Sequence, residues 1–371
     1  MSKGLMQSNM LETLKLLIKI GLGTEQPCTL PSELDLESLH RLAERQGVSA
    51  ICLDGLQSLI NERTIEPDSL DKCFLLQWIG SVLYQEHVFA CQLESAKWLA
   101  DLWAQNGLDT LVMKGFSLGR LYPRPAHRPC SDMDCFLQWT GQTVNSHEAS
   151  EKGNVLAEEN GLKVDRSYYK NSKILLKGLT VENHQYLLPI KGNRKAKKFE
   201  RQLRSWIYDG SNDYIADTKL MATAPFFDAI YVLAHAQEHF LNEGIVLRHV
   251  CDWAMVLKAY STAVNWDAWK ITCQKHGLLS FGYAMSRLAK DICGVNISFI
   301  CPPNEEADKR LLDDILKRRA HASDRTAFQT RVDLVNGMFR NRWKYQMFSD
   351  TNAFVFCSRR VWGYLFDKNL D

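Results

Sequence analysis

Two aspartates one residue apart lie in an apolar stretch near the middle of the chain. The segment "SDMDCFLQW", residues 131–139, alternates in a way that predicts a β-strand. Side chains at i and i+2 of a strand share one face, so Asp132 and Asp134 present two carboxylates side by side. Like charges on a packed sheet repel each other and lose hydration, and a bound hard cation is the usual compensation. The pair therefore indicates a metal site, in which a third carboxylate from a neighbouring strand would hold a second ion.

The spacing alone does not single out this pair. With 43 acidic residues in 371 positions, chance produces about five acid-x-acid pairs. The context is more informative, because the pair follows a glycine-containing turn and four basic residues, Lys114, Arg120, Arg124 and Arg128. From the residues alone, metal chemistry and a solvated edge strand are both open.

The surrounding periodicity predicts where these residues are held. Residues 1–105 carry apolar residues at helical spacing, and several of the segments end at glycine. Residues 106–215 contain five strand candidates around an exposed helix. From 216 to 371 the pattern is helical again, with charged helices near 304–320 and 325–347 and a last apolar segment. The prediction is an α+β fold in three domains, a small mixed β-sheet flanked by N-terminal and C-terminal helical regions.

The stretch "LVMKGFSLGRLYPRPAHRPCSDMDCFL" resembles the uncharacterised bacterial nucleotidyltransferase family within the DNA polymerase beta-like superfamily. Members of that family show a strand, Lys-Gly, a short helix with Leu and Tyr, an Arg, and then Asp-x-Asp on the next strand. The matching positions here are Lys114, Gly115, Leu118, Tyr122, Arg128, Asp132 and Asp134. The back half of the pattern, an acid two before a His and then a helix with spaced histidines and Arg-x-x-x-Asp, falls on Glu182, His184, His235, His239, Arg248 and Asp252. The resemblance covers roughly residues 105–258.

The chain departs from the superfamily pattern in two ways. The superfamily carries Gly-Ser at a shorter distance before the carboxylate pair, whereas here Lys114-Gly115 is followed by Phe116-Ser117. The third acid is Glu182 where Asp is more usual, and Asp165 competes for that position.

The resemblance implies nucleotidyl transfer from a nucleoside triphosphate to an unknown hydroxyl acceptor, which could be a small molecule, a glycan, a protein or RNA. It implies that Asp132, Asp134 and Glu182 hold two Mg²⁺ ions, with Mn²⁺ as an alternative. It also implies nucleotide and phosphate binding by Lys114, Gly115, Ser117, Arg128 and Arg248. The side chains expected around the site are His184, His235, His239 and Asp252.

Two other functions compete with this one. The same fold could bind nucleotides, or assemble with a partner, without catalysis. Alternatively, "HAQEH" at 235–239 matches an inverted zinc-peptidase motif, with His235 and His239 one helical turn apart beside Glu238. That zinc hydrolase would need a further downstream ligand.

Composition narrows the class of protein. The formal net charge is only +2, so no strong nucleic-acid signature is present. Eleven cysteines without a Cys-x-x-Cys motif indicate reduced thiols and a cytoplasmic location. No signal peptide and no membrane span are predicted. The basic run at 191–204 predicts a solvated, mobile surface, with attraction of a phosphate-rich acceptor as the alternative.

Overall fold

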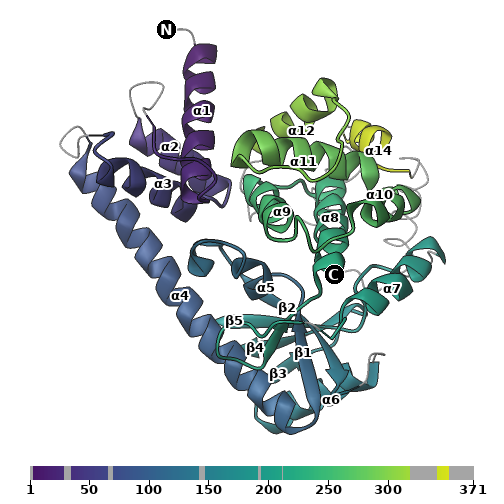
Figure 1. Cartoon of the computed structure of the whole chain (residues 1–371). Helices are drawn as coiled ribbons and strands as arrows, with labels where there is room; N and C mark the ends of the chain where they lie inside the picture. Colours follow the sequence, from purple (N-terminus) through teal and green to yellow (C-terminus); the bar gives the residue numbers. More distant parts are fainter. Residues whose placement is uncertain are drawn as a thin grey trace, which may run out of the picture.

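The computed structural model describes residues 3–28, 35–65, 70–141, 147–190, 194–210, 212–317 and 341–350. The first part is helical as predicted, with helices α1 (Lys3–Gly21), α2 (Leu36–Arg45), α3 (Ser49–Asn61) and α4 (Lys72–Gln105). Aspartate side chains accept hydrogen bonds from backbone N–H groups at the starts of α2 and α4, which fixes where these helices begin. The long helix α4 connects the N-terminal helices to the sheet (Figure 1).

A six-stranded mixed sheet follows, in the order β3-β4-β5-β2-β1-β6. Strands β2 and β5 are parallel and central, and β1 pairs with β2 antiparallel. The predicted α+β fold with helical flanks is confirmed. The sequence reading missed β6, which pairs with β1 in parallel although it is only three residues long. The elements are β1 (Leu108–Val112), α5 (Phe116–Gly119), η2 (Pro125–His127), β2 (Asp132–Trp139), α6 (His147–Glu159), β3 (Lys163–Asp165), β4 (Asn171–Leu176), β5 (Leu179–His184), α7 (Arg194–Trp206) and β6 (Leu220–Ala222).

The two faces of the sheet have different partners. Met133 and Val181 point into a core shared with α4 and α6. Alternation therefore directs the even-numbered residues of β2 and β5 to the opposite face. On that face, Leu111 and Phe136 join the core of the C-terminal helices. The acidic residues of β2 and β5, together with His184, thus point toward the helical part of the molecule.

The C-terminal part consists of α8 (Pro225–Asn242), α9 (Leu247–Ala259), α10 (Trp266–Lys275), α11 (Leu279–Cys293), α12 (Glu305–Lys317) and α14 (Arg342–Phe348). The predicted apolar segment at 353–366 and most of the predicted helix at 325–347 lie outside the described residues.

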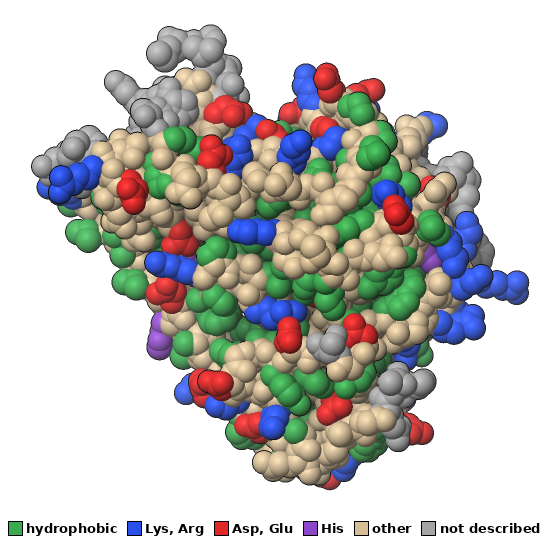
Figure 2. All heavy atoms as spheres, in the orientation of Figure 1, with side chains coloured by type: hydrophobic (Ala, Val, Ile, Leu, Met, Phe, Trp, Pro, Cys, Tyr) green, Lys and Arg blue, Asp and Glu red, His purple; other side chains and the backbone are tan. Residues whose placement is uncertain are grey.

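Residues 194–204 of the basic run belong to helix α7, so the solvated basic surface that the sequence predicts is one face of a helix. Its Phe199 and Leu203 are buried, so one face packs while the basic face is exposed. The buried carboxylate of Glu200 accepts backbone hydrogen bonds from Leu187 and Leu188 at 3.1 and 2.9 Å. Figure 2 shows basic side chains gathered on the side where α7 lies in Figure 1. The sequence analysis did not predict this helix, because seven basic residues obscured the helical spacing of the apolar ones.

The N-terminal and C-terminal helices share one hydrophobic core. The hydroxyl of Thr24, just after α1, donates to the carbonyl of Cys293 at the end of α11 (2.6 Å). The buried side chain of Gln46 donates to the carbonyl of Ile315 and accepts from the N–H of Leu247 (3.1 and 3.0 Å). The predicted domain limits stay a prediction, but these contacts tie the first helices to the last ones.

Candidate active site

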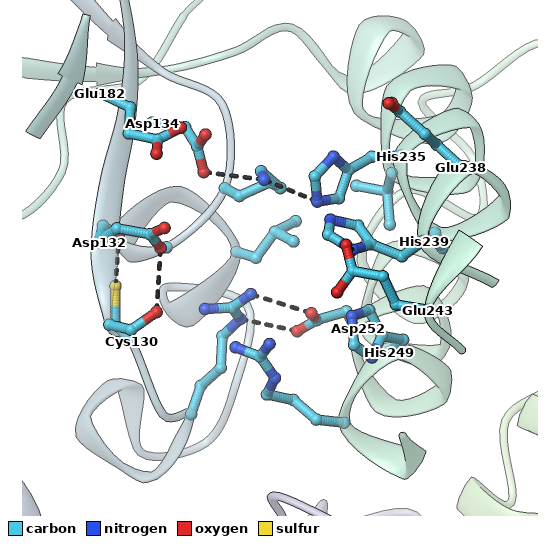
Figure 3. A pocket seen from close by; sticks show the side chains of 18 of the residues that line it. Cys130, Asp132, Asp134, Glu182, His235, Glu238, His239, Glu243, His249 and Asp252 are labelled. Carbon is cyan, nitrogen blue, oxygen red and sulfur yellow. Dashed lines mark hydrogen bonds and ion pairs between the residues drawn. The ribbon is translucent and has the colours of Figure 1, made fainter. Parts of the chain in front are cut away.

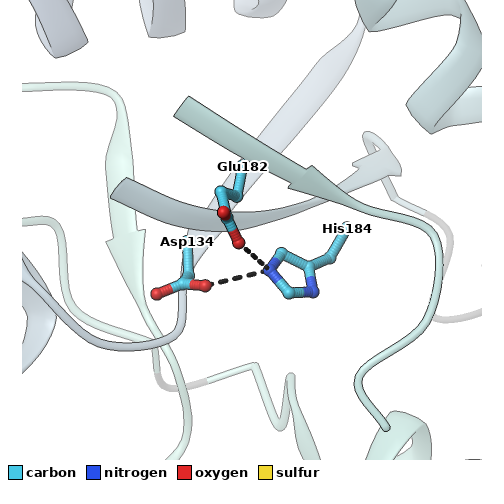
Figure 4. A group of neighbouring side chains, drawn as sticks. All are labelled: Asp134, Glu182 and His184. Carbon is cyan, nitrogen blue, oxygen red and sulfur yellow. Dashed lines mark hydrogen bonds and ion pairs between the residues drawn. The ribbon is translucent and has the colours of Figure 1, made fainter. Parts of the chain in front are cut away.

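The two central parallel strands bring carboxylates from distant segments together. The register places Asp134 of β2 opposite Glu182 of β5, and alternation directs both away from the α4–α6 core. The rival acid, Asp165, is exposed on edge strand β3, separated from β5 by β4. The third carboxylate near Asp134 is therefore Glu182 (Figure 4).

Asp134 is buried and lies between two nitrogen groups. The ammonium of Lys114 is 2.8 Å from its Oδ2, and the ring Nε2 of His184 is 2.9 Å from its Oδ1. Burial alone would raise the pKa of Asp134, but Lys114 and His184 hold it well below its usual value. Asp134 is therefore ionised across the physiological pH range.

His184 is oriented by the backbone. Its Nδ1 lies 3.1 Å from the carbonyl oxygen of Tyr186, so Nδ1 donates its proton there. Its Nε2 faces the carboxylates of Asp134 and Glu182, at 2.9 and 3.6 Å. Burial lowers the pKa of His184, but its bonds to Asp134 and Glu182 raise it more. Ligand atoms of Asp134, Glu182 and His184 all lie within 4.8 Å of one another, which is close enough to hold one metal ion.

Asp132 lies at the start of β2, on the same face as Asp134, and lines the same cavity. It is not part of the Asp134–Glu182–His184 group. Its carboxylate accepts a hydrogen bond from the hydroxyl of Ser131 (3.2 Å). Burial and the charge of Asp134 raise the pKa of Asp132. The folded protein therefore disfavours the charge on Asp132.

A glycine turn places Lys114 over the carboxylates. Gly115 has φ of 53°, and a Cβ there would lie 3.0 Å from Sγ of Cys130 and 3.3 Å from the carbonyl oxygen of Asp132. Glycine permits this close approach between the turn and the start of β2. Ser117, which was predicted to bind phosphate, is fully buried and does not line the cavity.

The opposite wall of the cavity comes from helices α8 and α9. Figure 3 shows His235, Glu238, His239 and Glu243 facing the strand carboxylates across it. Nε2 of His235 accepts a hydrogen bond from the ammonium of Lys114 at 2.8 Å. Burial and the charge of Lys114 hold the pKa of His235 well below its usual value, so this imidazole is neutral. The cavity has a volume of about 400 Å³.

A family model described as "Uncharacterised nucleotidyltransferase" matches residues 32–294, which is more than half of the chain. The chain belongs to this nucleotidyltransferase family. Membership supports its assignment as an enzyme of that class. No curated protein and no solved structure gave a significant match. Among the described helices, none is long and apolar enough to cross a membrane.

In this nucleotidyltransferase, Arg128 joins the two walls of the cavity. Its guanidinium donates from Nε and Nη2 to the two carboxylate oxygens of Asp252 on α9, at 2.7 and 2.9 Å. The hydroxyl of Tyr122 donates to the same carboxylate at 2.7 Å. Arg248 donates from Nη1 to the carbonyl of Pro129 (3.0 Å). The predicted phosphate roles of both arginines stay predictions, but Arg128 already has a bidentate partner.

Among the described residues, the helix histidines do not belong to a group that could hold zinc. Nε2 of His235 is engaged with Lys114, and its ring stands edge-on to that of His239 with centroids 4.3 Å apart. In the described part of the chain, the Asp134–Glu182–His184 group alone has the geometry for a metal ion. The zinc-hydrolase alternative therefore has no support in the structure.

Sequence reasoning missed several residues of the cavity wall, namely Cys130, Ser131, Lys170, Asn242, Glu243 and His249. Lys170 immediately precedes β4. Its carbonyl accepts hydrogen bonds from the N–H groups of Gln185 and Tyr186, at 2.8 and 3.0 Å, so Lys170 lies beside the end of β5. This long-range contact cannot be read from the sequence. The wall contains six carboxylates and four basic groups, so it carries a formal charge of −2 with its histidines counted as neutral. Such a wall attracts cations.

Proposed function

We propose that this protein is a metal-dependent transferase that moves a nucleotidyl group from a nucleoside triphosphate to a hydroxyl acceptor. The observation that carries the proposal is the convergence of Asp134, Glu182 and His184 on one side of a cavity. Family membership supports the reaction class. The likeness to the polymerase beta-like superfamily supports in-line transfer with loss of pyrophosphate.

The donor set fits a divalent cation. Carboxylate oxygens and an imidazole nitrogen are metal ligands, and the second ring nitrogen of His184 is held by a backbone carbonyl, as is usual for ligating histidines. Asp134, Glu182 and His184 would hold the ion, with Asp132 beside them for the second ion that the sequence predicts. Bound there, the ion would neutralise polyphosphate charge and favour deprotonation of the acceptor hydroxyl. The choice between Mg²⁺ and Mn²⁺ is part of the proposal.

The protein's own groups prepare this site. Lys114 keeps Asp134 ionised and fixes its orientation from one side, while His184 does so from the other. Because the cavity wall carries more carboxylates than basic groups, a free triphosphate is repelled. Nucleotide binding should therefore require a divalent cation.

The acceptor would enter from the helical wall. That wall presents the imidazoles of His235, His239 and His249 and the carboxylates of Glu238 and Glu243. Such groups suit a polar, hydroxyl-bearing acceptor, because each can donate or accept a hydrogen bond. We propose a cytoplasmic location on the basis of the cysteine content.

The test uses a panel of triphosphates with Mg²⁺ or Mn²⁺, measuring binding by calorimetry and turnover by pyrophosphate release. Asp132→Asn is the informative variant, because this carboxylate has a single hydroxyl partner and its removal should leave the fold intact. Asp165→Asn, an exposed carboxylate on the same sheet, is the matched control. We expect Asp132→Asn to weaken metal-dependent triphosphate binding and Asp165→Asn to have no effect.

Two results would change the conclusion. Absence of any triphosphate binding that depends on Asp132 would remove the proposed function. Binding without pyrophosphate release, across the panel and with varied acceptors, would instead favour the non-catalytic nucleotide-binding alternative on the same fold.

A further inference from the structure

Lys170 is a buried lysine whose side chain faces the cavity. It lies immediately before β4, is 9% exposed and lines the cavity that holds the strand carboxylates. Its charge acts on the rings of both His184, on the sheet, and His235, on α8 across the cavity. All three residues line the same cavity. The backbone of Lys170 is fixed, because its carbonyl accepts the N–H groups of Gln185 and Tyr186.

The other basic groups of the cavity wall have partners. Lys114 is held by Asp134 and His235, and Arg128 is held by Asp252. Arg248 donates to a backbone carbonyl. Within the described part of the chain, the ammonium of Lys170 has neither an ion pair nor a hydrogen bond. The ammonium is therefore free to meet a ligand in the cavity, and an anion there gains a charge-assisted interaction that the protein alone does not make.

The pairing of β5 with β2 and β4 shows in which order the polar residues of the site follow one another along the sheet. Along β5, Thr180 is opposite Asp132, Glu182 is opposite Asp134, and His184 is opposite Asn171, the residue after Lys170. Asp132 and Asn171 therefore lie at opposite ends of the polar row, about 13 Å of strand apart, and Lys170 lies one residue beyond Asn171. A triphosphate whose α-phosphate lies at the carboxylates can extend its terminal phosphates toward Lys170.

We propose that Lys170 binds the β- and γ-phosphates of the nucleotide and the pyrophosphate that leaves. This inference rests on the proposed function. In the reaction, the acceptor oxygen bonds to the α-phosphorus and the bond from that phosphorus to the bridging oxygen breaks. The electron pair stays on pyrophosphate, and the hydroxyl proton passes to solvent. The ammonium of Lys170 stabilises the charge that develops on pyrophosphate.

The experiment compares Lys170→Met and Lys170→Arg with Lys177→Met, an exposed lysine in the turn after the same strand. Calorimetry measures binding of inorganic pyrophosphate, of an α,β-methylene triphosphate and of Mn²⁺ alone. Loss of one charge-assisted hydrogen bond should weaken both phosphate ligands by about ten- to hundredfold. Mn²⁺ binding should not weaken, Lys170→Arg should retain most of the phosphate affinity, and Lys177→Met should match the wild type.

Thermal unfolding without ligand provides a second readout. Because the ammonium of Lys170 has no partner among the described residues, Lys170→Met breaks no internal bond, and its Tm should stay close to that of the wild type. A lower Tm, or a loss of Mn²⁺ affinity, would assign Lys170 a structural role and overturn the inference.

The failure of this inference is distinct from failure of the proposed function. If the wild type binds both phosphate ligands with Mn²⁺ and Lys170→Met binds them equally well, the inference alone is wrong. If the wild type binds neither ligand with any divalent cation, the proposed function is wrong and the inference with it.

Discussion

The ion pair between Arg128, just before β2, and Asp252 on α9 should make the protein sensitive to the loss of either partner. Both side chains are buried, at 4% and 5% exposure. Asp252 accepts two hydrogen bonds from Arg128 and one from Tyr122. Burial raises the pKa of Asp252, but the guanidinium lowers it more, so the carboxylate is charged. Removing either charged partner leaves the other charge buried without compensation.

The expected magnitude follows from this geometry. Asp252→Ala and Arg128→Met should each lower the free energy of unfolding by about 3–5 kcal/mol, as is typical when one partner of a buried pair is removed. Tyr122→Phe removes a single hydrogen bond and should cost about 1 kcal/mol. The double variant Arg128→Met/Asp252→Leu replaces both charges with apolar groups, so it should cost far less than the sum of the single changes.

Urea unfolding followed by circular dichroism measures these free energies. Glu37→Ala, which breaks an exposed pair with Arg41, is the surface control and should cost less than about 0.5 kcal/mol. The reasoning is refuted if Asp252→Ala is no more costly than Glu37→Ala, or if the double variant costs the sum of the single ones. A stable Arg128→Met that loses pyrophosphate binding would instead restore Arg128 to the phosphate-binding role predicted from the sequence.

Three further outcomes can be checked. Both ring nitrogens of His127 face carboxylates, Asp54 at 2.6 Å and Glu86 at 2.7 Å; burial lowers its pKa, but these bonds raise it more. The charged His127 should therefore stabilise the fold fully below about pH 6.5, and this contribution should disappear as pH rises through the raised pKa. The difference in unfolding free energy between the wild type and His127→Gln, measured across pH, checks this. His184→Ala should weaken Mn²⁺ binding by at least about tenfold and Mg²⁺ binding less, measured by calorimetry, because imidazole suits transition metals better; equal losses would argue against ligation. Gly115→Ala should cost more than about 1 kcal/mol in urea unfolding, since a Cβ at φ of 53° is strained and crowded, and an unchanged midpoint would contradict the turn geometry.

Local patterns were sufficient for the carboxylate strand. The alternation around Asp132 and Asp134 predicted β2, and the glycine before it predicted the turn. The family resemblance predicted that Glu182 would lie near the pair, and the register of β2 with β5 places it opposite Asp134. These features depend on strand periodicity and pairing, which leave a clear trace in sequence.

Other parts of the site depend on tertiary contacts that sequence does not reveal. Lys170 looks like a loop lysine until β4 and β5 pair and turn it toward the cavity. The pairing of Arg128 with Asp252 depends on the packing of α9, so the sequence shows only a basic residue before β2. Strand β6 has only three residues, too few for an alternating pattern to be recognised, and it is defined by its pairing with the edge of β1. Each of these features depends on which partner a residue meets, and no local pattern encodes that choice.

The hydrogen bonds between the first helices and the C-terminal helices have a consequence for synthesis on the ribosome. They join Thr24 with Cys293, and Gln46 with Leu247 and Ile315. The N-terminal helices emerge first, but part of their apolar surface can be covered only after α9 and α11 have been translated. That apolar surface therefore stays uncovered while about 200 further residues are translated. A shortened transcript that ends before α9 should yield an aggregation-prone product, even though it would contain both aspartates of β2 and the whole of β5.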